Sequence, residues 1–289
     1  EALRDALVQA AVRGSAAGGS AAVSMGMDDE AARLLRAELV MCSPLTRAIQ
    51  TCLIGMQPLL LPAQGACAPA ATSQRPNVAE AEADADVSLA AAVVAKALEV
   101  AYSQLDLEEP RQQQATVMTA HTVMLNPNLR EKRNFGGKDS SGKWCGAALT
   151  AGVHAELSTL YADVPSTAEA LCTVPLDLSA VENKWWLGSK ESEVHVSERI
   201  AELLAQLRFA PQSTIVLVGH SHYFREMLRH FRSPNCKASD ATGAPIDGGD
   251  LDAKKLSNAG IARCEFDWGA NEAKPVTEVQ LLFNSELVT

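Results

Sequence analysis

The chain has 289 residues, of which 47% are hydrophobic and 21% charged, a globular composition that excludes disordered, collagenous and coiled-coil classes. Acidic residues outnumber basic ones by 35 to 25, and the net charge of −10 argues against general nucleic-acid binding, because such a chain repels a phosphate backbone. A local basic pocket for a small anion is compatible with this charge, since salt screens the global field within about 10 Å.

The sequence shows neither a membrane span nor a disulfide framework. No stretch approaches the roughly 18 uncharged apolar residues that a spanning helix needs. The seven cysteines are scattered, odd in number and without a C-x-x-C pair, which favours reduced thiols in a soluble intracellular protein over disulfides or a zinc site. The compartment is left open, because a targeting signal upstream of Glu1 cannot be judged.

In the first half of the chain, short periodic segments alternate with regions of small or acidic residues. Ser43-Pro44 marks the start of a helix, because Ser is a favoured N-cap and Pro a favoured first helical residue. The predicted elements in order are a helix (1–13), a small-residue loop (14–27), a helix (28–36), a strand (38–42), a helix (43–57), an exposed insertion rich in Ala, Pro and acids (62–87), a helix (88–105) and a buried strand (116–125).

The second half continues the alternation of helices and strands. The segment TIVLV at 214–218 is a continuous apolar run, as expected for a strand buried in a parallel sheet. The predicted elements are a loop-rich region (126–152), an amphipathic helix (191–208, with Val194, Ile200, Leu203, Leu204 and Leu207 inward), a strand (214–218), a helix (222–232), a polar Gly-rich loop (234–254) and two strands (261–266 and 277–283). This order predicts an α/β domain with a mostly parallel sheet and helices on both of its faces.

Candidate functional residues follow two of the predicted strands, at the edge where ligands bind in parallel sheets. Arg47 lies in the first turn of a helix after the strand at 38–42, where helix amides and a guanidinium attract anions. His220 follows the strand at 214–218 and is placed for proton transfer or phosphate contact, as His222 is two residues later. Ordinary surface, capping and core roles remain open for all three residues.

Glu131 follows another strand, in the segment Leu129-Arg130-Glu131. A carboxylate brought close to a phosphate site, with a raised pKa, could act as a general acid. The alternative is a solvated glutamate in a loop, and Arg130 beside it has the same two interpretations.

Together these segments resemble the histidine phosphatase superfamily, the phosphoglycerate mutase-like proteins. Residues 43–51 (SPLTRAIQT) match the S-P-L-x-R-A-x-Q-T motif of that family, which is highly specific. Four further elements are similar to the family in their order along the chain. They are Leu129-Arg130-Glu131, Glu191-Ser192 with Val196 and Arg199, Val218-Gly219-His220-Ser221-His222 with Arg225, and Leu256-Ser257-Asn258-Ala259-Gly260. The resemblance covers residues 1 to about 285 as a single domain, with insertions at 14–27, 62–115 and 234–254.

The resemblance implies a three-layer α/β/α sandwich and phosphoryl transfer through a phosphohistidine. Carried over by motif, Arg47 binds phosphate, His220 is the second histidine of the phosphate site and Glu131 is the candidate acid. The substrate would be a small phosphomonoester or a phosphoprotein. The pattern requires no cofactor and shows no metal-ligand spacing.

One element of the family pattern is missing from the sequence. The family's nucleophile is the histidine of an Arg-His-Gly motif on the first strand, whereas the first histidine here is His121. Aligning residues 3–10 with the family's first helix places the nucleophile strand roughly 15–30 residues before Glu1. We therefore expect that strand upstream, or another segment in its place.

Two functions follow from this pattern. In the first, the protein is a histidine phosphatase, favoured over a mutase because of the insertion at 62–115 and the altered segment after Glu131. In the second, it is a catalytically inactive subunit that keeps the fold and serves a structural or regulatory role in a larger assembly. The missing histidine and the low-complexity insertions favour the second function.

Overall fold

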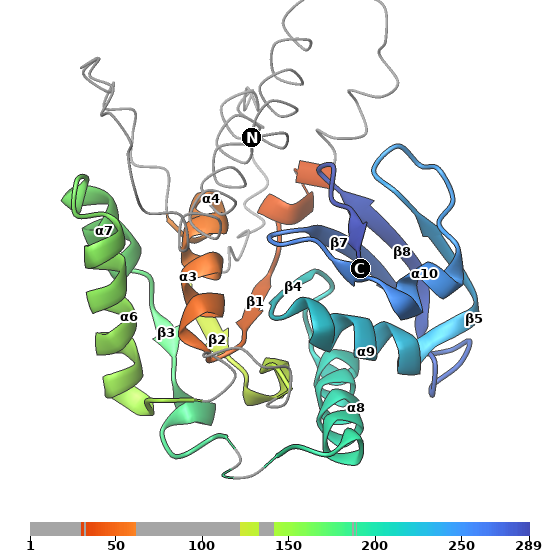
Figure 1. Ribbon diagram of the computed structural model, residues 1–289, viewed down its shortest axis with the longest axis horizontal. Helices are drawn as coiled ribbons and strands as arrows, with labels where there is room; N and C mark the ends of the chain where they lie inside the picture. The colour runs from red at the N-terminus through yellow and green to blue at the C-terminus, as the bar shows by residue number, and fades with distance from the viewer. Residues whose placement is uncertain (1–29, 32, 62–121, 133–141, 187, 189) are drawn as a thin grey trace, which may run out of the picture.

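A computed structural model describes residues 30–31, 33–61, 122–132, 142–186, 188 and 190–289 (Figure 1). Several sequence predictions lie outside these residues. They are the helices at 1–13 and 88–105, the insertions at 14–27 and 62–115, and residues 116–121 of the predicted strand at 116–125. The family alignment of residues 3–10 lies outside them as well.

A four-stranded parallel sheet forms the centre of the fold, in agreement with the predicted α/β class. Its strands are β1 (Leu39–Cys42), β2 (Val123–Leu125), β3 (Leu176–Asp177) and β4 (Ile215–Val218). Their order is β3-β2-β1-β4, and every neighbouring pair is parallel. The register pairs Cys42 with Val218, so that β1 and β4 end at the same level.

Apolar side chains of β1 alternate between two hydrophobic clusters. Val40 and Cys42 pack with one group of helices, whereas Met41 packs with another. The first group comprises α3 (Thr46–Gly55), α4 (Gln57–Leu60), α6 (Gly146–Leu160) and α7 (Pro165–Cys172). The second comprises α8 (Glu193–Phe209) and α9 (Ser221–Phe231). In α8, Ile200, Leu203 and Leu204 are buried as predicted. The prediction was wrong for Val194, which is 63% exposed, because it lies two residues, or about 200°, from the buried Val196.

A second sheet lies on the β4 side of the first, with α9 beside it (Figure 1). It contains β5 (Arg232–Ser239), β8 (Val276–Leu282) and β7 (Ile261–Phe266), in the order β5-β8-β7. Two short strands, β6 (Lys255–Leu256) and β9 (Leu287–Val288), pair antiparallel next to it.

Three predictions about local structure were wrong, the third only in part. Residues 234–254 are not a loop, because they contain most of β5 and the whole of α10 (Gly248–Ala253), which buries Leu251. Ser43 is not the N-cap of the following helix, because α3 begins at Thr46 and its N-cap is Leu45. The region at 126–152 that was predicted to be rich in loops contains one 3-10 helix, η1 (Pro127–Leu129), but the prediction was wrong for its end, where α6 begins at Gly146. A second 3-10 helix, η2 (Ser179–Val181), follows β3.

Across the described part of the chain, no helix combines the length and apolar character needed to cross a bilayer.

Candidate functional site

The site begins where β1 and β4 end side by side. Ser43 follows β1 and its backbone N–H donates to the Val218 carbonyl at 2.8 Å. The Ser43 hydroxyl lies 2.9 Å from His220 Nε2, across 177 residues of sequence, and its oxygen also accepts from the Leu45 N–H at 3.4 Å. The hydroxyl that was expected to cap a helix therefore holds the histidine ring.

His220 is buried and electrically neutral. Its side chain is 9% exposed, and burial lowers its pKa to about 3, assisted by the positive charges of Arg47 and Arg199. A neutral imidazole carries one N–H donor and one acceptor nitrogen. While one nitrogen contacts Ser43, the other can donate or accept a single hydrogen bond. A bound anion would offset the two arginines and favour the protonated ring.

Arg47 occupies the first turn of α3, at the same edge of the sheet as His220. α3 starts directly after β1 because the chain turns at Ser43–Leu45, and this turn brings the amino end of the helix to the carboxyl end of the sheet. Helix amides and a guanidinium at this place attract negative charge. Arg47, His220 and Glu131 line the same cavity, and the positive charge of Arg47 favours the neutral form of His220 and the ionised form of Glu131.

Glu131 comes from the segment that follows η1. Burial raises its pKa, and this effect outweighs the opposing influence of the Lys132 backbone N–H, which donates to Oε1 at 2.9 Å, and of Arg199, Arg47 and Arg225. A carboxyl group with a raised pKa beside cations can hold a proton and release it to a leaving group.

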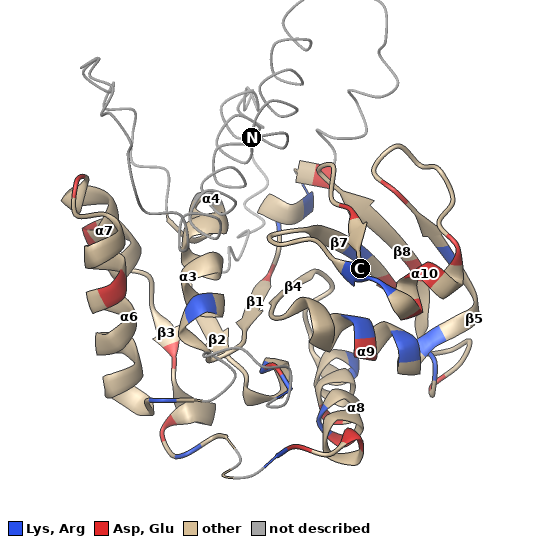
Figure 2. Ribbon diagram, in the orientation of Figure 1, with Lys and Arg blue, Asp and Glu red and all other residues tan. Residues whose placement is uncertain are grey.

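These residues line one end of a cavity of about 870 Å³. Figure 2 shows Lys and Arg residues on α3 and α9, and Arg47 of α3 and Arg225 of α9 both line the cavity. The residues that we call the cationic end line this cavity and act on one another electrostatically; they are Arg47, His220, His222, Arg225 and Lys255, with Glu131 among them. The lining contains four further basic residues, Arg33, Arg36, Lys254 and Arg263. The molecule as a whole carries −10, yet this end of the cavity suits an anion.

A buried ionic network supports the site from the side of α8. Glu191 is 2% exposed and accepts hydrogen bonds from Arg130 at 2.8 Å and from Arg199 at 2.9 and 3.1 Å. Arg199 also donates to the Asn128 carbonyl at 2.8 Å and stacks 4.7 Å from the centre of the Tyr223 ring. The network fixes the backbone just before Glu131.

The structure brings Arg47, His220 and Glu131 together and gives Arg130 a different place. The Arg130 guanidinium pairs with Glu191 and with the Pro127 carbonyl, so its role is to hold η1. Sequence reasoning missed Ser43 as the partner of His220 and Lys255 as a cation of the cavity. The Ser43 contact depends on which strands are neighbours, and Lys255 carries no signal beyond its proximity to the segment at 256–260.

No group of three or more His, Cys, Asp or Glu residues within the described ranges is arranged to hold a metal ion. In comparisons with protein-family models, curated proteins and solved structures, no match to this chain was found.

Proposed function

We propose that this chain forms the phosphate-binding site of a phosphoglycerate mutase-like histidine phosphatase that hydrolyses a small phosphomonoester or a phosphoprotein. The observation that supports it is the meeting of Arg47, His220 and Glu131, from three separate elements, at the cationic end of one cavity. The motif resemblance assigns a role to each of these three residues. The proposal includes the three-layer α/β/α sandwich and a nucleophile strand upstream of Glu1.

In the proposed reaction, the upstream histidine attacks phosphorus and the bond from phosphorus to the ester oxygen breaks. Glu131 donates its proton to the departing alkoxide, giving an alcohol and a phosphohistidine. Water then attacks the phosphohistidine and gives its proton to the Glu131 carboxylate, which releases inorganic phosphate and the free imidazole. Arg47 and His220 hold the phosphoryl oxygens, in line with a reaction that depends on positioning and charge neutralisation.

The test separates phosphate binding from turnover. Binding of inorganic phosphate is measured by titration calorimetry on residues 1–289, and hydrolysis of alkyl phosphates is measured on the full-length protein. We expect Arg47→Ala to weaken phosphate binding by roughly 10- to 100-fold, because it removes a charge-assisted hydrogen bond. Arg208→Ala is the matched control, since Arg208 pairs with Glu272 at the far end of α8 and does not line the cavity.

Glu131→Gln is the variant that reports on acid catalysis. It should retain phosphate binding and reduce hydrolysis of alkyl phosphates by about 10²- to 10⁴-fold, because the amide cannot give a proton to the leaving group. Equal phosphate affinity in wild type and Arg47→Ala would refute the site. Phosphate binding without turnover in the full-length protein would identify the alternative, an inactive histidine phosphatase-fold subunit of a larger assembly.

A further inference from the structure

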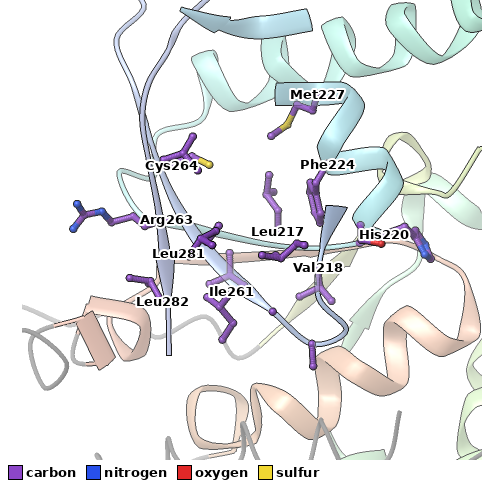
Figure 3. Close-up of a pocket in the computed structure, with 18 of the residues that line it drawn as sticks. Leu217, Val218, His220, Phe224, Met227, Ile261, Arg263, Cys264, Leu281 and Leu282 are labelled. Atoms are coloured by element: carbon purple, nitrogen blue, oxygen red, sulfur yellow. The ribbon is translucent and has the colours of Figure 1, made fainter. Parts of the chain in front are cut away.

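The hydrogen bond between Ser43 and His220 joins two residues whose backbones are fixed by the fold. The Ser43 N–H donates to the Val218 carbonyl at 2.8 Å, and His220 is the N-cap of α9, with its carbonyl accepting from the Phe224 N–H at 3.0 Å. Figure 3 shows the His220 ring at the start of α9, apart from Leu281 of the second sheet. The direction of the hydrogen bond then depends on which of the two side-chain atoms carries the proton.

The Ser43 hydroxyl has one proton to donate, and the residue is fully buried, with 0% of it exposed. Its oxygen accepts from the Leu45 N–H at 3.4 Å, and this N–H can act only as a donor. Across the described ranges, His220 Nε2 at 2.9 Å is the one acceptor that contacts the hydroxyl. A buried O–H without an acceptor is costly, so we expect the Ser43 O–H to donate to Nε2.

This direction of donation decides which ring nitrogen of His220 carries the proton. When Nε2 accepts from Ser43, a neutral ring has its proton on Nδ1. In the other tautomer, Nε2 would donate to the Ser43 oxygen and leave the Ser43 proton without an acceptor. The cost of that buried proton favours the Nδ1–H form by roughly tenfold or more.

We infer that Ser43 is a positioning residue that fixes His220 as a neutral Nδ1–H donor toward an anion in the cavity. Nε2 is held by Ser43, so Nδ1 is the nitrogen of this cavity-lining residue that remains for a ligand. A bound anion offsets the charges of Arg47 and Arg199, but a charged ring would still leave the Ser43 proton without an acceptor, so the ring stays neutral. The tautomer is a property of the free protein, and only the identity of the anion as phosphate rests on the proposed function.

The experiment reads the tautomer directly in the protein labelled with nitrogen-15 histidine. Long-range proton–nitrogen correlation spectra distinguish a protonated from an unprotonated ring nitrogen, and His220→Gln identifies the signals of this residue. At neutral pH we expect Nδ1–H for wild type, and an Nε2–H population that rises by about tenfold or more in Ser43→Ala. Ser43→Thr keeps the hydroxyl and should keep the Nδ1–H form. Ser285→Ala is the matched control, because it removes another buried serine hydroxyl that lies outside the cavity lining.

Titration with inorganic phosphate tests the role of Nδ1 as a donor. In wild type, added phosphate should shift the Nδ1 resonance of His220 as the N–H begins to donate to a phosphate oxygen. Ser43→Ala should weaken phosphate binding by about fivefold or more, because only the fraction of molecules in the Nδ1–H form can donate. Ser43→Thr and Ser285→Ala should bind phosphate as wild type does.

The wild-type spectrum decides the tautomer even where Ser43→Ala does not fold. An Nε2–H or a charged ring in wild type, or an Nδ1–H form that persists in folded Ser43→Ala, would overturn the inference. Equal phosphate affinity in wild type and in a Ser43→Ala protein whose tautomer has changed would overturn it as well. The Nδ1–H form in wild type without any phosphate binding would support the tautomer assignment and refute only the proposed function.

Discussion

The neutral imidazole of His220 links the site to the stability of the molecule. Its pKa is about 3 in the folded chain, against an ordinary value of 6.5, because burial and the neighbouring arginines disfavour the charged ring. Below pH 6.5 the unfolded chain therefore binds a proton at this residue, whereas the folded chain does not bind it until the pH falls to about 3. Stability is fully present above pH 6.5 and is lost as the pH falls between these two values.

The lowered pKa of His220 predicts that acid destabilises the protein partly through this one residue. Between pH 7 and pH 5, His220 should account for a loss of about 2 kcal/mol in the free energy of unfolding, measured by urea denaturation. His220→Gln, which keeps an amide opposite Ser43, should remove that part of the pH dependence. His195→Gln, at an exposed position of α8, should leave it unchanged. An identical loss in wild type and His220→Gln would contradict the assignment.

The ionic network is the main polar connection between η1 and α8. Glu191 compensates two guanidinium groups, of which Arg199 is 5% exposed and Arg130 is largely buried. Removing the carboxylate leaves both charges without their counter-ion in a buried place, which is far more costly than losing a surface ion pair. The backbone before Glu131 would lose its support at the same time.

We therefore expect Glu191→Gln to lower the free energy of unfolding by about 3–5 kcal/mol in urea denaturation. Glu272 provides the control, because its side chain is 71% exposed and it pairs with Arg208, whose side chain is itself 33% exposed. Glu272→Gln should cost about 1 kcal/mol or less. Similar losses in the two variants would show that the Glu191 network is not a significant source of stability.

The sequence predicts well those elements whose own composition matches the burial that their neighbours give them. β1 and β4 are short apolar runs, and their burial between helices follows from that pattern. β5 could not be predicted, because its sequence RSPNCKAS is polar and contains Pro234. It is a strand because it lies at a sheet edge and pairs with β8, where a proline is tolerated. α10 is similar, since its six residues bury only Leu251.

The same distinction holds for the site. The positions of Arg47 and His220 after apolar strands were visible in the sequence, and so was their placement at the ligand-binding edge. That Ser43 contacts His220 could not be predicted, because it requires β1 and β4 to be direct neighbours across more than a hundred residues of connection. The Arg130–Glu191 pair likewise depends on how α8 packs against η1.

At the scale of the whole molecule, the two sheets have cores of different size. The second sheet rests on a cluster with three fully buried apolar residues, Leu251, Val276 and Val279, whereas the first sheet has large clusters on both faces. Leu228 and Phe266 pack against both the small cluster and the α8–α9 cluster, but the open cavity keeps β4 and β7 apart. A small core that is weakly joined to a larger one unfolds at lower denaturant.

Tryptophan fluorescence can follow the junction of the two parts separately from the cluster around α3 and α6. Trp268 stacks on Phe266 at the end of β7 and packs against the α8–α9 cluster, whereas Trp144 and Trp185 pack against the cluster around α3 and α6. Subtracting the urea curve of Trp268→Phe from that of wild type isolates the signal of Trp268. We expect this difference curve to have its midpoint at a lower urea concentration than the curve of Trp268→Phe, which reports on the other tryptophans. Coincident midpoints in residues 1–289 would mean that the sheets already unfold as one unit through α9.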